Sequence, residues 1–349
     1  MIITKINPSM IDDGGLAYVT IVKAQTQAAL EQAMDDAGAG GTIFVPAGTY
    51  NVSGFASRAD YQTLIFQPGA KLFRTGGMHV FNVTHVGTRV FGGEFDGNKQ
   101  AGDPLFRAIS ASADCGIEIH DALIKNIAGY GIGAVDGRFI VKGCTFGTIG
   151  YISIFFQSEL FRAVAPIIVE DNTITNTGAD YNDYGGIIIK TNNTVGNFLV
   201  SPLIRGNRVT LPVPANATEA STKYPNSVCI ELRGSSVGVV ADNAVNGGVI
   251  GVSIAKSNHS KAYANHAVGC FYYGLEAADT NDRTQFFGNT VTGSNGVSGQ
   301  SCGASISASS NNTSLVGNAM YSNLQRIRIT GDCSGTTEDF VARAGGYNA

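Results

Sequence analysis

The chain has 349 residues and a formal net charge of −4 at pH 7; 14% of its residues are charged, 45 are Gly and none is Trp. Its charge, and the absence of any Lys/Arg cluster longer than two residues, argue against nucleic acid as a partner. No stretch of 18 apolar residues is present, so we expect no membrane span, and the N-terminus lacks the pattern of a secretory signal. No grouping of His or Cys has metal-ligand spacing, so we expect no metal and no other cofactor.

The first predicted element is a helix near the N-terminus. In QTQAALEQAMDDAGAG, residues 25–40, apolar residues recur at helical spacing, and the pattern stops in the run of glycines that begins at Gly38. The next stretch, TIFVPAGTYNVSG, predicts a strand, a turn and a second strand. Since the open end of a stack of strands exposes unpaired edges, we expect this helix to cap the first coil.

A repeated phrase dominates the rest of the chain: an apolar residue, small or polar residues, Asn, any residue, then an apolar one. It occurs as VEDNTIT, IRGNRVT, VADNAVN, AYANHAV, FFGNTVT and LVGNAMY, with weaker copies upstream. The shortest spacing, from Ala122 to Cys144, is 22 residues. The repeated position is occupied by Ala122, Cys144, Asn172, Asn207, Asn243, Asn265, Asn289 and Asn318.

A second repeated phrase, Gly-apolar-x-apolar, lies between these Asn positions, for example GIIIKT at 186–191 and GVSIAK at 251–256. Short strands that repeat near 22 residues cannot bury a face alone, but they can when stacked. The pattern therefore predicts a parallel β-helix in which the Asn amides form a ladder from coil to coil. We divide the chain into an N-terminal extension (1–22), the capping helix (23–41), the β-helix (42–330) and a C-terminal tail (331–349).

The order of the helix, GGTIFVPAGTYNVSG, GGEFDGNK at 92–99 and the Asn coils resembles the pectate-lyase-like superfamily, which includes phage tailspikes, polysaccharide lyases and alginate epimerases. The resemblance implies an all-β, single-stranded right-handed parallel β-helix with a polysaccharide ligand along one long face. By resemblance to phage spikes, it also implies a homotrimer on the virion, or outside the cell after release. The segment after Asn318 contains no coiled-coil heptads.

Alternation within the strands predicts which side chains face a ligand, because residues between two inward positions point outward. We expect three adjacent coils to present Glu231 with Arg233, then Ser253 with Lys256, then Glu276 with Asp279. Lys256 would then have acidic residues on the coils on either side of it. The predicted outward column contains Gly133, Ser153, Ile188, Glu231, Ser253, Glu276 and Ser305.

Two carboxylates with a cation between them can have separated pKa values, as an acid and a base require. Glu231 and Glu276 lie two coils apart, so their Cα atoms should be about 9–10 Å apart, near the separation typical of inverting glycosidases. The hypothesis is a hydrolase in which these two residues are acid and base, in either order. Lys256 and Asp279 complete the predicted catalytic cluster.

Further residues are predicted to bind the substrate. The insertion DYNDYGG supplies aromatic rings and carboxylates that suit a sugar ring, and other polar or aromatic residues lie along the predicted outward face. The predicted substrate-binding residues are Arg233, Lys190, Asp180, Asp183, Tyr181, Tyr184, Asp136 and Phe155.

Other interpretations of the same residues stay open. In a lyase, Lys256 or Tyr184 would take a proton next to a uronate carboxylate that Arg233 or Lys190 neutralises. The fold would equally serve a non-catalytic carbohydrate-binding or adhesin spike, or a structural spike whose face is buried between protomers. Finally, alternating charges on neighbouring strands also stabilise a sheet surface without any function.

Overall fold

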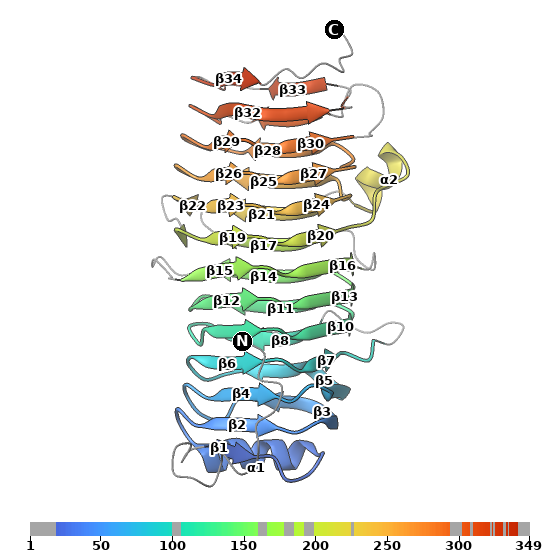
Figure 1. Ribbon diagram of the computed structural model, residues 1–349, viewed down its shortest axis with the longest axis vertical. Helices are drawn as coiled ribbons and strands as arrows, with labels where there is room; N and C mark the ends of the chain where they lie inside the picture. The colour runs from blue at the N-terminus through green and yellow to red at the C-terminus, as the bar shows by residue number, and fades with distance from the viewer. Residues whose placement is uncertain are drawn as a thin grey trace.

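The computed structural model describes residues 19–99, 106–159, 166–177, 185–191, 199–224, 227–293, 302–307 and 310–340, the last range without 322, 324, 331, 332 and 334. Within these residues, 32 strands form one continuous parallel sheet that winds into a long stack of coils (Figure 1). Each complete coil contributes three strands, because β12, β13 and β14 pair with β15, β16 and β17 of the next coil. The chain is therefore an all-β parallel β-helix with three faces.

The first face begins with β1 (Val19–Ile21), which pairs with the first full strand, β2. At its other end are the first part of β32 (Ser314–Tyr321) and β34 (Thr337–Phe340). Strand pairing thus reaches Phe340, whereas the sequence analysis placed the start of a tail at 331. Between β1 and β32, the first face consists of β2 (Thr42–Val45), β4 (Thr63–Phe66), β6 (Thr88–Phe91), β9 (Ile117–His120), β12 (Phe139–Lys142), β15 (Ile167–Glu170), β19 (Leu203–Arg205), β23 (Val239–Ala241), β26 (Lys261–Tyr263) and β29 (Gln285–Phe287).

The second face follows directly in each coil. It starts with the first parts of β3 (Gly48–Ala56) and β5 (Ala70–Val83) and ends with the second part of β32. Its other strands are β7 (Glu94–Asp96), β10 (Leu123–Ile127), β13 (Thr145–Ile149), β16 (Thr173–Thr177), β20 (Arg208–Thr210), β24 (Ala244–Asn246), β27 (His266–Val268) and β30 (Thr290–Thr292).

The third face carries the candidate site. After the second parts of β3 and β5, it consists of β8 (Arg107–Ala111), β11 (Tyr130–Val135), β14 (Ile152–Ser158), β17 (Gly185–Thr191), β21 (Val228–Arg233), β25 (Ile250–Ala255), β28 (Tyr273–Ala278), β31 (Cys302–Ser307) and β33 (Gln325–Thr330). A separate two-stranded pair, β18 (Leu199–Val200) and β22 (Ser235–Ser236), lies outside the main sheet.

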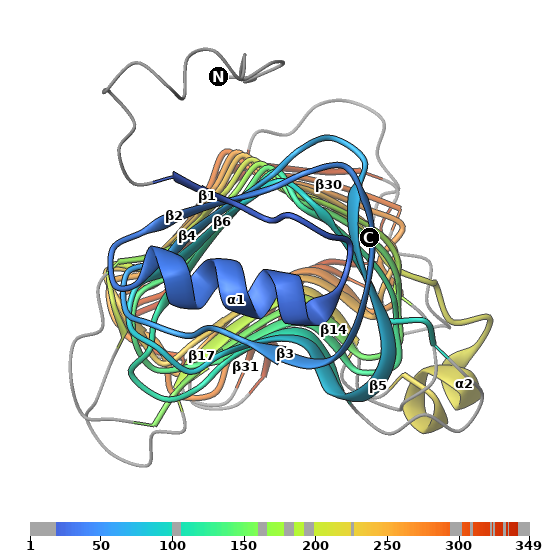
Figure 2. The same ribbon diagram turned by 90° about the horizontal axis from the view of Figure 1, so that it is seen from below.

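The predicted N-terminal helix is α1 (Gln27–Ala37), which lies across the bottom of the stack (Figure 2). The hydroxyl of Thr26 caps its first turn by accepting a hydrogen bond from the Ala29 N–H at 3.2 Å. Its inner side buries Leu30 and Met34 against the first coil. The helix therefore covers the apolar end of the core, which confirms the predicted cap. Neither described helix has the length and hydropathy of a membrane-spanning segment.

The predicted Asn ladder is confirmed at the corner between the first and second faces. The Oδ1 of Asn243, for example, accepts from the backbone N–H of Asn207 at 2.9 Å and from its Nδ2 at 3.0 Å. Every Asn from Asn172 to Asn318 in this column is at most 1% exposed. The amides thus satisfy backbone groups that the corner removes from sheet pairing.

Candidate functional site

The register of the third face places Glu231, Ser253 and Glu276 in one outward column. Glu231 pairs with Ser253, and Ser253 pairs with Glu276 on the next coil. The two glutamates are therefore two coil steps apart, about 9–10 Å between Cα atoms. The whole column runs through Ser110, Gly133, Phe155, Ile188, Glu231, Ser253, Glu276, Ser305 and Arg328.

One member of the predicted column is wrong. Gly133 pairs with Phe155, not with Ser153, so the β14 segment is shifted by two residues from the predicted register. Ser153 is instead fully buried, and its hydroxyl has no hydrogen-bond partner within the described part of the chain. The error has a physical reason: YISIFF is apolar at so many positions that alternation alone leaves its register open.

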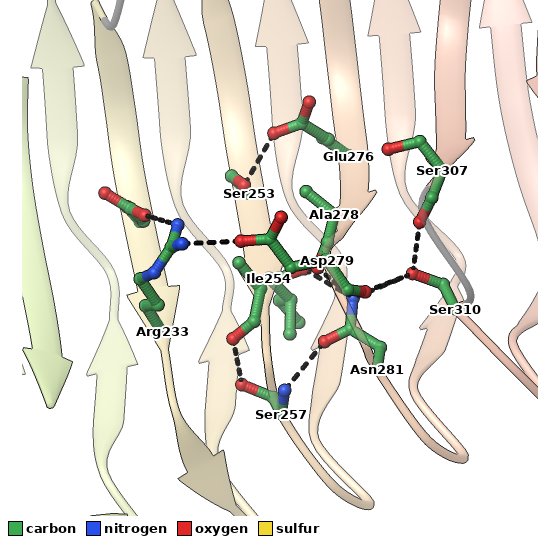
Figure 3. A network of polar contacts seen from close by, with 12 residues as sticks. Arg233, Ser253, Ile254, Ser257, Glu276, Ala278, Asp279, Asn281, Ser307 and Ser310 are labelled. Carbon is green, nitrogen blue, oxygen red and sulfur yellow. Dashed lines mark hydrogen bonds and ion pairs between the residues drawn. The ribbon is translucent and has the colours of Figure 1, made fainter. Parts of the chain in front are cut away.

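The carboxyl group of Glu276 lies in a distinct environment. The Ser253 hydroxyl donates a hydrogen bond to its Oε2 at 2.7 Å (Figure 3). The pKa of Glu276 is raised to about 7, mainly by burial, and the negative charges of Glu231 and Asp279 add to this increase. The hydrogen bond from Ser253 acts in the opposite direction and lowers the pKa. Near neutral pH, a large fraction of the protein molecules therefore has a protonated Glu276. A proton donor must be in this protonated form to act.

Glu231 and Asp279 share one cation, Arg233. The Nη1 of Arg233 lies 3.3 Å from Oε1 of Glu231, and its Nη2 lies 2.5 Å from Oδ2 of Asp279. Figure 3 shows the Arg233 side chain extending across the neighbouring coil towards Asp279. The positive charge of Arg233 also lowers the pKa of Glu276. Three carboxyl groups and one guanidinium are thus gathered on the wall formed by β21, β25 and β28.

The register places Lys256 on the coil between those of Glu231 and Glu276, as predicted, but Lys256 does not bridge their carboxyl groups. It has a φ of 48° at the corner that follows β25, and its exposed side chain forms no ion pair with a described residue. Gly234 and Asp279, at the matching corners, have φ values of 69° and 55°. The position is thus a left-handed turn, and Arg233 provides the bridging charge that the sequence analysis assigned to Lys256.

Lys190 and Phe155 lie lower on the same face. The Nζ of Lys190 is 5.2 Å from the centre of the Phe155 ring, and Lys190 pairs with Arg233 on the next coil. Phe155 is 7% exposed and packs with Ile152 and Ile188. Lys190 is therefore placed beside the carboxylate cluster, whereas the ring of Phe155, a predicted substrate-binding residue, is buried.

Asp136, which was also predicted to bind substrate, is buried. It is 1% exposed, and its Oδ1 accepts hydrogen bonds from the Ser158 hydroxyl at 2.8 Å and from the Glu159 N–H at 3.0 Å. These bonds stabilise the corner after β11, so the carboxylate is not presented to a ligand. The predicted binding residues Asp180, Tyr181, Asp183 and Tyr184 lie outside the described residues.

The sequence analysis missed a pair at the upper end of the wall. Arg328 lies in the same column as Glu276, with Ser305 between them, and its Nη1 lies 3.1 Å from the hydroxyl of Tyr273. Burial raises the pKa of Tyr273. The alternation of QRIRIT at 325–330 could have revealed Arg328, because it repeats the outward pattern of the earlier strands.

One side of the wall is bordered by an insertion that contains α2 (Ala217–Thr222). Ala220 and Tyr224 pack against Val249, which immediately precedes β25, and Phe271, which lies two residues before β28. The insertion therefore stands at the corner where the strands bearing Ser253 and Glu276 begin. This contact rests on buried apolar side chains, so the border is part of the folded structure.

Comparison with known proteins identifies the fold. No protein family model matches the chain, and no curated protein matches its sequence. Among solved structures, it is similar to the Dettilon tailspike protein (11% identity; 93% of this chain and 64% of that chain; TM-score 0.61). It is also similar to Geobacillus virus E2 ORF18 (13% identity; 94% of this chain and 62% of that chain; TM-score 0.56). A third similar structure is polygalacturonase from Erwinia carotovora ssp. carotovora (10% identity; 93% of this chain and 94% of that chain; TM-score 0.52).

At these identities the likeness shows the fold alone. The chain is a right-handed parallel β-helix protein, which confirms the predicted fold. It spans slightly less than two thirds of the length of the two phage structures.

Proposed function

We propose that the protein cleaves a polysaccharide by hydrolysis on the third face, with Glu276 as general acid and Glu231 as general base. The observation that carries the proposal is the position of two outward carboxyl groups, two coils apart in one column, in different environments. Glu231 faces the guanidinium of Arg233, whereas burial, with the negative charges of Glu231 and Asp279, raises the pKa of Glu276 to about 7. The environment of Glu276 thus favours the neutral carboxyl group that a general acid requires.

The proposed reaction follows from this arrangement. Glu276 donates a proton to the oxygen of the bond being broken, while Glu231 removes a proton from a water molecule that attacks the sugar from the opposite side. Two strand spacings between the Cα atoms, about 9–10 Å, leave room for that water. We therefore expect inversion at the anomeric carbon. Asp279 holds Arg233 in place, and Arg233 and Lys190 are proposed to contact the substrate.

The structural matches support the proposed substrate class. A polygalacturonase and a phage tailspike share this fold, which supports a polysaccharide as the ligand of this chain. The rings and carboxylates of Asp180, Tyr181, Asp183 and Tyr184 remain proposed substrate contacts. From the two phage matches we further propose a virion protein that acts as a homotrimer, which sedimentation velocity would test through the mass of the particle.

The test is cleavage of a panel of purified bacterial surface polysaccharides and polygalacturonate. New reducing ends should form without the ultraviolet absorbance of an unsaturated sugar, and Glu231→Gln and Glu276→Gln should each lower the rate at least about 10³-fold. Glu118→Gln, a glutamate substitution on the first face, is the matched control and should retain activity.

Three results would contradict the proposal. Products with an unsaturated sugar would establish a lyase instead. Binding of a glycan that the protein never shortens would favour a carbohydrate-binding spike. Unchanged cleavage by both glutamine variants would show that the acid and base lie elsewhere.

A further inference from the structure

A concavity lies away from the glutamate wall, at the corner where the third face turns into the first. It has a volume of about 640 Å³ and is lined by Val237, His259, Lys261, Arg283, Gln285 and Asn312. These residues come from consecutive coils near β23, β26, β29 and β32. The volume lies in the range of small-ligand sites.

The corner explains why these side chains project outward. His259, Arg283 and Asn312 have φ values of 52°, 53° and 51°, so the same left-handed turn recurs on three coils. Lys261 and Gln285 follow two residues later and pair directly across β26 and β29. The result is two parallel rows of polar side chains, one on the corner and one on the first face.

The charge of the concavity is positive although the chain as a whole is acidic. Its lining contains Lys261 and Arg283 and, among the described residues, no carboxylate; the Asp282 carboxylate lies at its edge, where it accepts a hydrogen bond from Nδ2 of Asn312 at 2.9 Å. The Nη1 of Arg283 lies 3.0 Å from Nε2 of His259. The nearest acidic partner of Arg283 is Asp282 at 3.9 Å, and both side chains are largely exposed, so this ion pair is weak. The two cations are therefore available to an anionic ligand.

An apolar surface adjoins the two cations on the same strands. Tyr263 and Phe287 lie two residues beyond Lys261 and Gln285, hence on the same side of the sheet. Their rings are stacked with centres 4.9 Å apart, and Phe287 is 38% exposed. Cations, amides and apolar ring surface next to one another match the carboxylate, hydroxyl and C–H groups of an acidic sugar.

We propose that this corner is a binding site for an acidic glycan segment, separate from the cleavage site on the third face. Lys261 and Arg283 bind a sugar carboxylate, Gln285 and Asn312 bind hydroxyl groups, and Tyr263 with Phe287 packs against the C–H surface. Such a site binds the polymer without cleaving it. It does not depend on the catalytic roles of Glu231 and Glu276.

The absence of Trp from the chain permits a local test. Phe287→Trp introduces a single fluorophore beside the concavity, and Tyr321→Trp introduces one on the second face as the matched control; Tyr321 is similarly exposed. A uronic-acid hexasaccharide should change the fluorescence of the first variant in a saturable manner and leave the second unchanged. Both variants also carry Glu231→Gln and Glu276→Gln, which prevents cleavage of the probe.

Charge variants then identify the binding groups. In the Phe287→Trp background, Lys261→Gln with Arg283→Gln should weaken binding of the hexasaccharide at least about tenfold, since two charge-assisted contacts are lost. Lys23→Gln with Arg208→Gln removes the same charge from exposed positions elsewhere and should leave the affinity within about twofold. A neutral glucose hexasaccharide should bind at least tenfold more weakly than the acidic one.

Each alternative result would overturn the proposal. Equal binding of the neutral hexasaccharide would exclude recognition of a carboxylate. Tighter binding of a single-stranded oligonucleotide of the same charge would assign the site to phosphate instead. An unchanged affinity in the Lys261 and Arg283 variant would show that these cations do not bind the ligand. Because the readout is local fluorescence and not cleavage, none of these outcomes depends on whether the protein is a hydrolase.

Discussion

Arg233 and Asp279 are 46 residues apart in the chain, yet their side chains form a 2.5 Å ion pair across two coils. Arg233 pairs with Ala255, and Ala255 pairs with Ala278, the residue before Asp279. The small side chain of Ala255 leaves space for the guanidinium to pass over it, and Ala255 is 1% exposed. The stacking of coils thus converts distant positions into one charged cluster.

Arg233→Gln should move the pH dependence of cleavage. Arg233 lowers the pKa of Glu276, so loss of its charge should raise that pKa further. Because the proton donor acts in its protonated form, the limb on which activity falls should shift to higher pH. The measurement is kcat/KM against pH, with Arg205→Gln on the first face as control. A limb at the same pH in both variants would contradict the assigned acid.

The pH profile of the unchanged protein should itself identify the acid. Glu276 has a pKa of about 7, so kcat/KM should fall tenfold per pH unit well above that value. In Glu276→Asp the limb should remain although the rate is lower, because a carboxyl group is retained. In Glu276→Gln the residual rate should lack this limb. Persistence of the limb in the glutamine variant would assign it to another group.

Glu276 should also make the stability of the fold depend on pH. Its pKa is raised in the folded protein from 4.5 to about 7, so between these values the folded state binds more protons than the unfolded state. The free energy of unfolding should therefore fall as the pH rises through this window, by at most about 3 kcal/mol. Urea unfolding of Glu276→Gln should show a smaller loss between pH 5 and pH 8 than the parent; equal losses would contradict the burial of this carboxyl.

Asn243→Ala should destabilise the β-helix strongly. The substitution removes the acceptor for two hydrogen bonds from Asn207 and the donor to the Ile204 carbonyl, and it leaves buried polar groups without partners. We expect a loss of about 2–4 kcal/mol in the free energy of unfolding. Asn246→Ala, at an exposed position three residues later, is the control and should change stability by less than about 0.5 kcal/mol. Similar losses at both positions would refute a special role for the ladder.

Lys256→Gln should leave cleavage within about twofold of the parent rate. Its exposed side chain forms no ion pair with a described residue, in contrast to Arg233. The measurement is the initial rate on the same polysaccharide, beside Lys23→Gln as a control substitution of an exposed lysine outside both proposed sites. A loss of 10³-fold or more in Lys256→Gln alone would instead support the lyase alternative, in which this lysine takes a proton from a uronate.

The sequence by itself determined the winding of the chain. Its Asn phrases recur because every coil must turn the same corner and satisfy the same backbone groups, so the periodicity is a direct record of the fold. Alternation within the strands likewise predicts that Glu231, Ser253 and Glu276 lie on one wall, as their register shows. The capping helix could be predicted for the same reason, since its apolar spacing is local.

Which charged side chains form ion pairs with one another is determined only by the tertiary structure. Alternation states which side of a strand a residue occupies, but not how far a long side chain reaches or what conformation a corner adopts. Lys256 therefore looked like the central cation, although it forms no ion pair with a described residue and Arg233 reaches Asp279 instead. The burial of Phe155 and Asp136 was not predicted for a related reason. The burial of a side chain depends on residues that other coils contribute, and a local sequence pattern does not show which residues these are.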